Sequence, residues 1–150
     1  MPFWKKLFGE DTEEKVDYYR EGLELLQVSK YHEALTSFRL ALRESPGDEA
    51  VLQQIAITYT RIGMTEEAAR TYRTVLAHQP DSPGAHYGLA FLMLHDNRKE
   101  DAVRHLRSFL ASPPAGPEAQ RHIDHARRTL EELTASADSA AAPADGGTEG

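Results

Sequence analysis

Two histidines near the C-terminal end of the chain have the spacing best suited to chemistry. His122 and His125 are three positions apart, so on a helix they would share one face and could both reach a metal ion. A stable metal site needs three or four converging ligands, and most neighbours of this pair are charged residues that favour water. We therefore expect the pair to lie on a solvated helix face, and we predict no metal site and no cofactor.

No other group of residues in the chain indicates catalysis. The sequence lacks a phosphate-binding loop, a glycine-rich dinucleotide motif and the paired histidines of a zinc protease. The complete absence of cysteine excludes disulfides and thiolate nucleophiles. We predict that the protein is not an enzyme.

The composition favours a folded domain whose partners are not nucleic acids. Hydrophobic residues make up 40% of the 150 residues, charged residues 27%, and the net charge is −7. Nucleic acid binding calls for a positively charged surface, which this balance argues against. Because no apolar run is long enough to span a bilayer and the N-terminus lacks the features of a secretory signal, we expect a cytoplasmic protein.

Several residue types recur along the chain with a fixed period of 34 residues. The recurring positions are occupied by a proline, by alanine, by another small residue and by a bulky residue. They are Pro46, Pro80 and Pro114; Ala34, Ala68 and Ala102; Gly22, Ala56 and Ala90; and Phe38, Tyr72 and Leu106. A period of this length is typical of stacked helix–turn–helix units.

Apolar residues within each unit follow helical spacing, which predicts an all-α solenoid. We expect three two-helix units at 15–48, 49–82 and 83–116, then a capping helix over 117–134. Asp48 is a plausible N-cap, and Gly63 should end a helix at a turn. The predicted flexible ends are a short amphipathic segment over 1–12 and a disordered tail over 135–150, which has no periodicity.

These recurring positions resemble the tetratricopeptide repeat (TPR) family. The second unit fits the family pattern best, the first departs from it at Glu21 and Leu25, and the third departs at His86, Met93 and Phe109. At His86 the family has a large core residue, so we expect this histidine to pack in the core with a hydrogen bond. The matching positions of the second unit are Leu52, Ile55, Ala56, Tyr59, Ala68, Tyr72, Val75 and Pro80.

The resemblance implies that one stripe along the first helix of each unit lines a concave groove that binds a partner. Carried over, this stripe contains Val16, Tyr19, Leu23, Leu26, Ala50, Gln53, Ile57, Thr60, Gly84, Tyr87, Phe91 and Leu94. It lacks the basic and asparagine residues with which some TPR proteins hold chaperone C-termini, so we predict an amphipathic helix or an apolar peptide as the ligand. The alternative is that these side chains belong to the core.

The N-terminal segment combines aromatic residues with lysines. Its apolar side chains would share one helical face, with the two lysines opposite. This pattern favours contact with a membrane interface, but the segment could also pack on the body, fold back into the groove or bind a partner. The residues concerned are Phe3, Trp4, Lys5, Lys6, Leu7 and Phe8.

Together these features predict a protein-interaction scaffold. The main hypothesis is an adaptor that binds a protein or peptide in its groove, in the cytoplasm or at the inner membrane face. The alternative is a self-assembling platform in which the repeats form a homo-oligomer.

Overall fold

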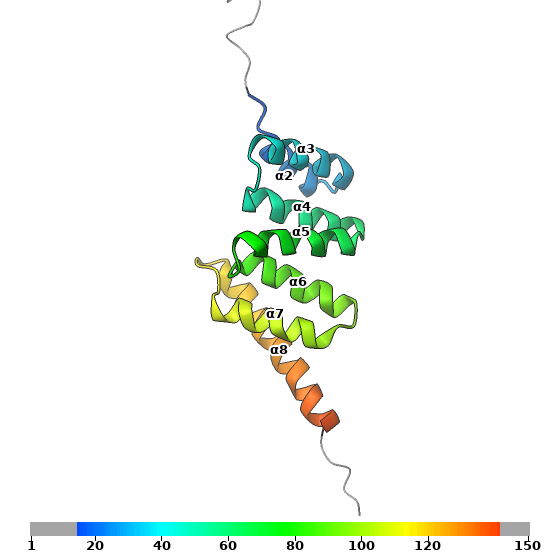
Figure 1. Ribbon diagram of the computed structural model, residues 1–150, viewed down its shortest axis with the longest axis vertical. Helices are drawn as coiled ribbons and strands as arrows, with labels where there is room; N and C mark the ends of the chain where they lie inside the picture. The colour runs from blue at the N-terminus through cyan, green and yellow to red at the C-terminus, as the bar shows by residue number, and fades with distance from the viewer. Residues whose placement is uncertain (1–14, 142–150) are drawn as a thin grey trace, which may run out of the picture.

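The computed structural model describes residues 15–141, and within this range the chain forms seven α-helices and no strand. The first six helices form three antiparallel hairpins, and the seventh closes the array (Figure 1). They are α2 (Tyr18–Gln27), α3 (Tyr31–Glu44), α4 (Glu49–Ile62), α5 (Thr65–His78), α6 (Pro83–His95), α7 (Lys99–Ala111) and α8 (Ala119–Ala141). The predicted all-α solenoid is confirmed.

Each helix packs mainly on its neighbours in sequence, which gives the molecule its elongated shape (Figure 1). In addition, α2 contacts α4, and α4 contacts α6. The first helices of the three hairpins therefore lie side by side along one face of the stack, as stacked repeats require.

Short polar and glycine signals define where the hairpins begin and turn. The side chain of Asp48 accepts a hydrogen bond from the backbone N–H of Val51, at 3.3 Å, so it is the N-cap that the sequence predicts for α4. Asp17 and Ser82 cap α2 and α6 in the same way. Gly63 ends α4 with φ of +92°, a conformation that side chains with a Cβ rarely adopt.

The periodic residues are the contact points between helices. Ala34, Ala68 and Ala102 are fully buried, and a Cβ added at Gly22 would lie 2.5 Å from Cε1 of Phe38. The small residues thus let helix backbones approach closely while the bulky residues fill the adjacent space. This packing is the physical reason for the period of 34 residues in the sequence.

The last helix differs from its prediction at both ends. It begins at Ala119, after a turn at Pro117 and Glu118, and it continues to Ala141 instead of ending at 134. Residues 135–141 were expected to belong to a disordered tail, but they are rich in alanine, and extending an existing helix needs no new nucleation. Residues 142–150 lie outside the described range. Among the described helices, none has the length and apolar character needed to cross a membrane.

Candidate functional site

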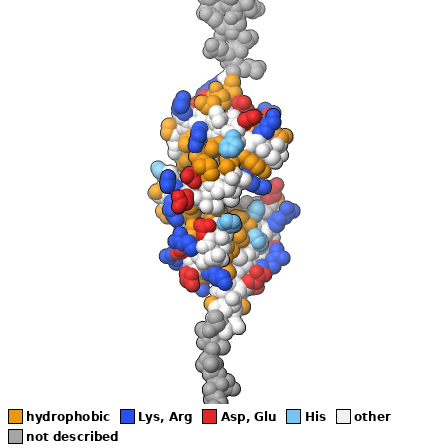
Figure 2. Space-filling view, turned by 90° about the vertical axis from the view of Figure 1, so that its right-hand side faces the viewer, with side chains coloured by type: hydrophobic (Ala, Val, Ile, Leu, Met, Phe, Trp, Pro, Cys, Tyr) orange, Lys and Arg blue, Asp and Glu red, His pale blue; other side chains and the backbone are white. Residues whose placement is uncertain are grey.

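A groove of about 850 Å³ lies between α4 and α6. Apolar, aromatic and small side chains make up most of its lining, and six predicted residues of the concave stripe are among them. These six are Gln53, Ile57, Thr60, Gly84, Tyr87 and Phe91. Figure 2 shows one long face of the molecule, on which hydrophobic side chains gather between charged edges.

Other residues of the predicted stripe lie elsewhere. Tyr19 lines a smaller hollow beside α4, and its ring packs 6.0 Å from that of Phe38. Leu23 and Leu26 pack against the core cluster around Phe38, and Leu94 packs against the core of the second and third hairpins. Val16 precedes α2 and is 50% exposed. In the first hairpin, the stripe therefore contributes more to packing than to the groove.

Two glycines shape the floor of the groove. A Cβ at Gly88 would lie 2.2 Å from Cζ of the buried Tyr72, and a Cβ at Gly84 would lie 2.1 Å from Oε1 of Gln53. These side chains rest directly on the backbone of α6, which lets the hairpins approach closely. Gly84 belongs to the stripe predicted from the sequence and Gly88 does not, although a second glycine one helical turn later was a signal for this contact.

Helix α8 contributes two histidines to the edge of the groove. The hydroxyl group of Tyr87 lies 2.7 Å from Nδ1 of His125, whose ring stacks on Phe91 with centroids 4.7 Å apart. His122 meets the Tyr87 ring edge-on, at 5.1 Å, and also lines the groove. Both histidines are exposed to solvent, as predicted, and their rings also pack on aromatic side chains of α6.

The hydroxyl group of Tyr87 can donate to Nδ1 of His125 or accept from it, depending on the tautomer of the imidazole ring. Burial raises the pKa of Tyr87, which favours the protonated hydroxyl group. Together with the aromatic contacts, each worth about 0.5–1.5 kcal/mol, this bond fixes α8 against the groove.

The two ends of the groove differ in charge. Glu49, in the first turn of α4, accepts hydrogen bonds from Nε2 of Gln53 at 2.9 Å and from Oγ of Ser82 at 2.6 Å. Arg61 lines the groove near the other end of α4. The groove therefore has a carboxylate at one end and a guanidinium group at the other.

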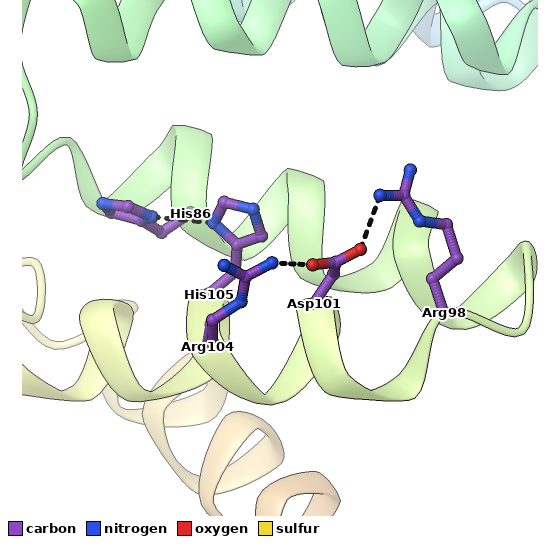
Figure 3. Close-up of polar contacts among 5 residues, drawn as sticks. All are labelled: His86, Arg98, Asp101, Arg104 and His105. Atoms are coloured by element: carbon purple, nitrogen blue, oxygen red, sulfur yellow. Dashed lines mark hydrogen bonds and ion pairs between the residues drawn. The ribbon is translucent and has the colours of Figure 1, made fainter.

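A second polar cluster lies between α6 and α7 (Figure 3). Nδ1 of His86 lies 3.1 Å from Nδ1 of His105, and Nε2 of His86 lies 2.7 Å from the carbonyl oxygen of Pro80. His86 is buried and hydrogen-bonded, as its position in the repeat predicts. Asp101 forms ion pairs with Arg104 on the same helix and with Arg98, the residue directly before α7.

The electrostatics of this cluster favour a neutral His105. Burial lowers its pKa to about 4, and repulsion from His86, Arg104 and nearby arginines adds to the effect. Within residues 15–141 no group of three or more histidine, cysteine, aspartate or glutamate side chains converges as a metal site would require.

Three stacked helical hairpins, a terminal helix and a groove along the first helices form an array of helical repeats. The model of the family described as tetratricopeptide repeat matches residues 63–121. This match confirms the resemblance seen in the sequence over residues 63–121. A comparison with curated proteins gives no match.

Solved structures share this fold over most of the chain. PcrH from Pseudomonas aeruginosa, in complex with the chaperone binding region of PopD, superimposes with a TM-score of 0.72 and 22% identity, covering 85% of this chain and 94% of PcrH. The type III secretion translocator chaperone SycD of Yersinia enterocolitica gives 0.74 and 17%, with 86% and 88% covered. The Sgt2 TPR domain of Aspergillus fumigatus gives 0.67 and 20%, with 93% and 91% covered. At these identities the likeness shows the fold.

Proposed function

We propose that this chain is an interaction adaptor that binds an apolar segment of a protein partner in the groove between α4 and α6. The observation that carries the proposal is the groove itself, whose lining joins Ile57 of α4 to Tyr87 and Phe91 of α6. Aromatic and aliphatic side chains that remain open to solvent are the usual anchors for an amphipathic helix or an extended peptide.

The dimensions and energetics suit a peptide ligand. Burying three apolar anchors contributes roughly 5–9 kcal/mol before the cost of association is subtracted. That cost leaves an expected dissociation constant in the micromolar range, which is appropriate for a reversible adaptor. The opposite charges of Glu49 and Arg61 would orient the peptide along α4.

Structural neighbours support this use of the fold. PcrH was solved with the chaperone binding region of PopD, and the first TPR of Spaghetti (RPAP3) was solved bound to an HSP90 peptide, SRMEEVD. The second peptide is acidic, whereas the groove described here is mainly apolar and has Glu49 at one end. An apolar ligand fits this lining better than an acidic tail.

A selection of peptides from a random displayed library against the full chain tests the proposal. Binding of the selected peptides is then measured by calorimetry with the wild type, with Ile57→Glu and with the control Val28→Glu. Val28 is an exposed apolar residue in the turn after α2 and does not line the groove. Ile57→Glu should weaken binding at least tenfold and Val28→Glu should not. Equal binding by all three proteins would exclude the groove as the peptide-binding site.

Self-association remains the second proposal, because apolar side chains are exposed at the start of the array. Among the described residues, no helix covers the outer side of the first hairpin, and Val16 and Val28 are exposed beside it. Light scattering over a concentration series tests this: a rising mass supports a homo-oligomer, and a constant monomer mass excludes it.

Membrane contact through Phe3, Trp4, Lys5, Lys6, Leu7 and Phe8 is still a prediction, because these residues lie outside the described range. A location in the cytoplasm or at the inner membrane face, and a function without catalysis, likewise stay predictions.

A further inference from the structure

The groove does not end at α4 but continues towards the start of the first hairpin. A hollow between α2 and α4 shares Glu49 and Gln53 with the groove. A third hollow shares Tyr19 and Asp48 with the second and reaches Asp17, directly before α2. The three hollows thus adjoin one another and mark a path, here called the channel, from Asp17 to the groove.

The first part of this channel is acidic. Asp17, Glu44, Asp48 and Glu49 line the two outer hollows, and no lysine or arginine does so. Within residues 15–141 none of these four carboxylates forms an ion pair. The channel thus presents unneutralised negative charge first and apolar surface beyond it, so a fitting ligand combines basic with aromatic residues.

The chain's own N-terminal segment has this composition. Lys5 and Lys6 are flanked by Phe3 and Trp4 on one side and by Leu7 and Phe8 on the other. An extended chain from Trp4 to Asp17 can span about 40 Å. Crossing from α2 over α4 to α6 takes two steps of about 10 Å each between helix axes. The segment is therefore long enough to reach the groove from its point of attachment.

We propose that residues 3–8 occupy the groove of their own chain, with the aromatic side chains on its floor and the lysines at the acidic hollows. The proposal rests on the groove being a peptide site, as argued above. The segment then acts as an internal competitor that a partner must displace. A tethered segment has an effective concentration of about 1 mM, so at micromolar intrinsic affinity it would weaken partner binding by roughly 100- to 1000-fold.

Trp4 is the single tryptophan of the chain, so its fluorescence reports on this segment alone. The experiment measures acrylamide quenching of Trp4 in the full chain and in a synthetic peptide of residues 1–14. We expect quenching of the full chain to be several-fold weaker than that of the free peptide. Equal quenching would overturn the proposal.

Groove variants of the full chain decide where Trp4 is protected. Ile57→Glu places a charge in the groove, and Thr60→Arg adds bulk and positive charge at an exposed position that lines it. Both should restore peptide-like quenching while circular dichroism confirms the helical fold, and Val28→Glu should behave as the wild type. Protection that survives in both folded groove variants would overturn the proposal.

Two further measurements distinguish other possible binding sites of residues 3–8, on a second copy of the chain or on a membrane. Protection that is lost on dilution together with a fall in scattering mass would place the segment in a second copy and overturn the same-chain proposal. Protection that appears only with phosphatidylserine vesicles would assign it to membrane contact and overturn it too. In either case, library peptides that bind wild type but not Ile57→Glu would still support the adaptor function.

Discussion

The hydroxyl group of Tyr87 on α6 lies 2.7 Å from Nδ1 of His125 on α8, which joins the wall of the groove to the last helix. This contact links two parts of the chain that are 38 residues apart. The position of the terminal helix and the shape of the groove therefore depend on each other.

Replacing Tyr87 with phenylalanine should loosen α8 without removing the aromatic packing. The change deletes one side-chain hydrogen bond, so we expect the free energy of unfolding to fall by about 0.5–1 kcal/mol. Relative to the wild type, Tyr87→Phe should increase the rate of amide hydrogen exchange more in α8 than in α2. The control is Tyr31→Phe, which removes only an exposed local bond to Ser29. Equal protection of α8 in both variants would show that the Tyr87 hydrogen bond contributes nothing.

The two groove glycines should respond differently to alanine. In Gly88→Ala the new Cβ meets the ring of buried Tyr72, and relieving that overlap should cost about 1–3 kcal/mol of stability. In Gly84→Ala it meets the end of the flexible Gln53 side chain, which can rotate away at the loss of its hydrogen bond to Glu49. Alanine gains less than about 1 kcal/mol in helix propensity there, because Gly84 is the second residue of α6. Urea denaturation should rank Gly84→Ala near wild type and Gly88→Ala below it; the reverse order would contradict the packing described.

Stability should fall on acidification because of His105. Its pKa is lowered in the folded state to about 4, so between that value and the unfolded value of 6.5 the unfolded chain binds more protons. The stabilisation that the neutral His105 contributes is complete above pH 6.5 and is lost as the pH falls towards 4. Allowing for the partial exposure of His105, we expect a loss of about 1–2 kcal/mol.

Unfolding in urea at pH 7.5 and pH 4.5 measures this loss. His105→Gln should show a smaller difference in stability between the two pH values, whereas His32→Gln, at an exposed position, should keep the wild-type difference. An unchanged pH dependence in His105→Gln would assign the loss to other groups.

Truncation of the chain tests how much each part of α8 contributes to stability. Ala126 is fully buried against Leu106 and Phe109, with Ile123, Leu130 and Leu133 beside it. Ending the chain after Pro117 should therefore lower the unfolding free energy by about 3–5 kcal/mol. Ending it after Thr134 should change it by less than about 1 kcal/mol, because the described side chains of 135–139 are exposed. Thermal unfolding of the two truncated chains checks this ranking.

Much of the fold could be predicted from the sequence because its helix contacts repeat. Ala68 and Ala102 occupy the same position in two repeats, and Gly22 and Phe38 each have a counterpart 34 residues later. These positions recur because the helices of each hairpin pack in the same way. Gly63 and Asp48 mark helix ends through local backbone chemistry alone. The end of α8 was missed because Ala-rich sequence is compatible with either a helix or a disordered tail, and attachment to an existing helix decides between them.

The site was less predictable because it depends on tertiary packing. The residues Gln53, Ile57, Tyr87 and Phe91 line the groove, whereas Leu23 and Leu26 contact the cluster around Phe38. Nothing in their spacing distinguishes the two groups, since both follow the same helical stripe. The aromatic contacts of His122 and His125 depend on where α8 lies relative to α6, which the sequence of α8 alone does not determine.

The hydrogen bond from Ser82 to Glu49 joins the start of the third repeat to the start of the second, so these two hairpins hold the groove between them. The first hairpin lies to one side of this pair. Among the described residues, the first hairpin packs on one neighbouring hairpin, whereas the second hairpin is packed on both sides. Amide exchange should therefore be faster in α2 and α3 than in α4 and α5. A ligand bound between α4 and α6 would slow amide exchange in the second and third hairpins more than in the first.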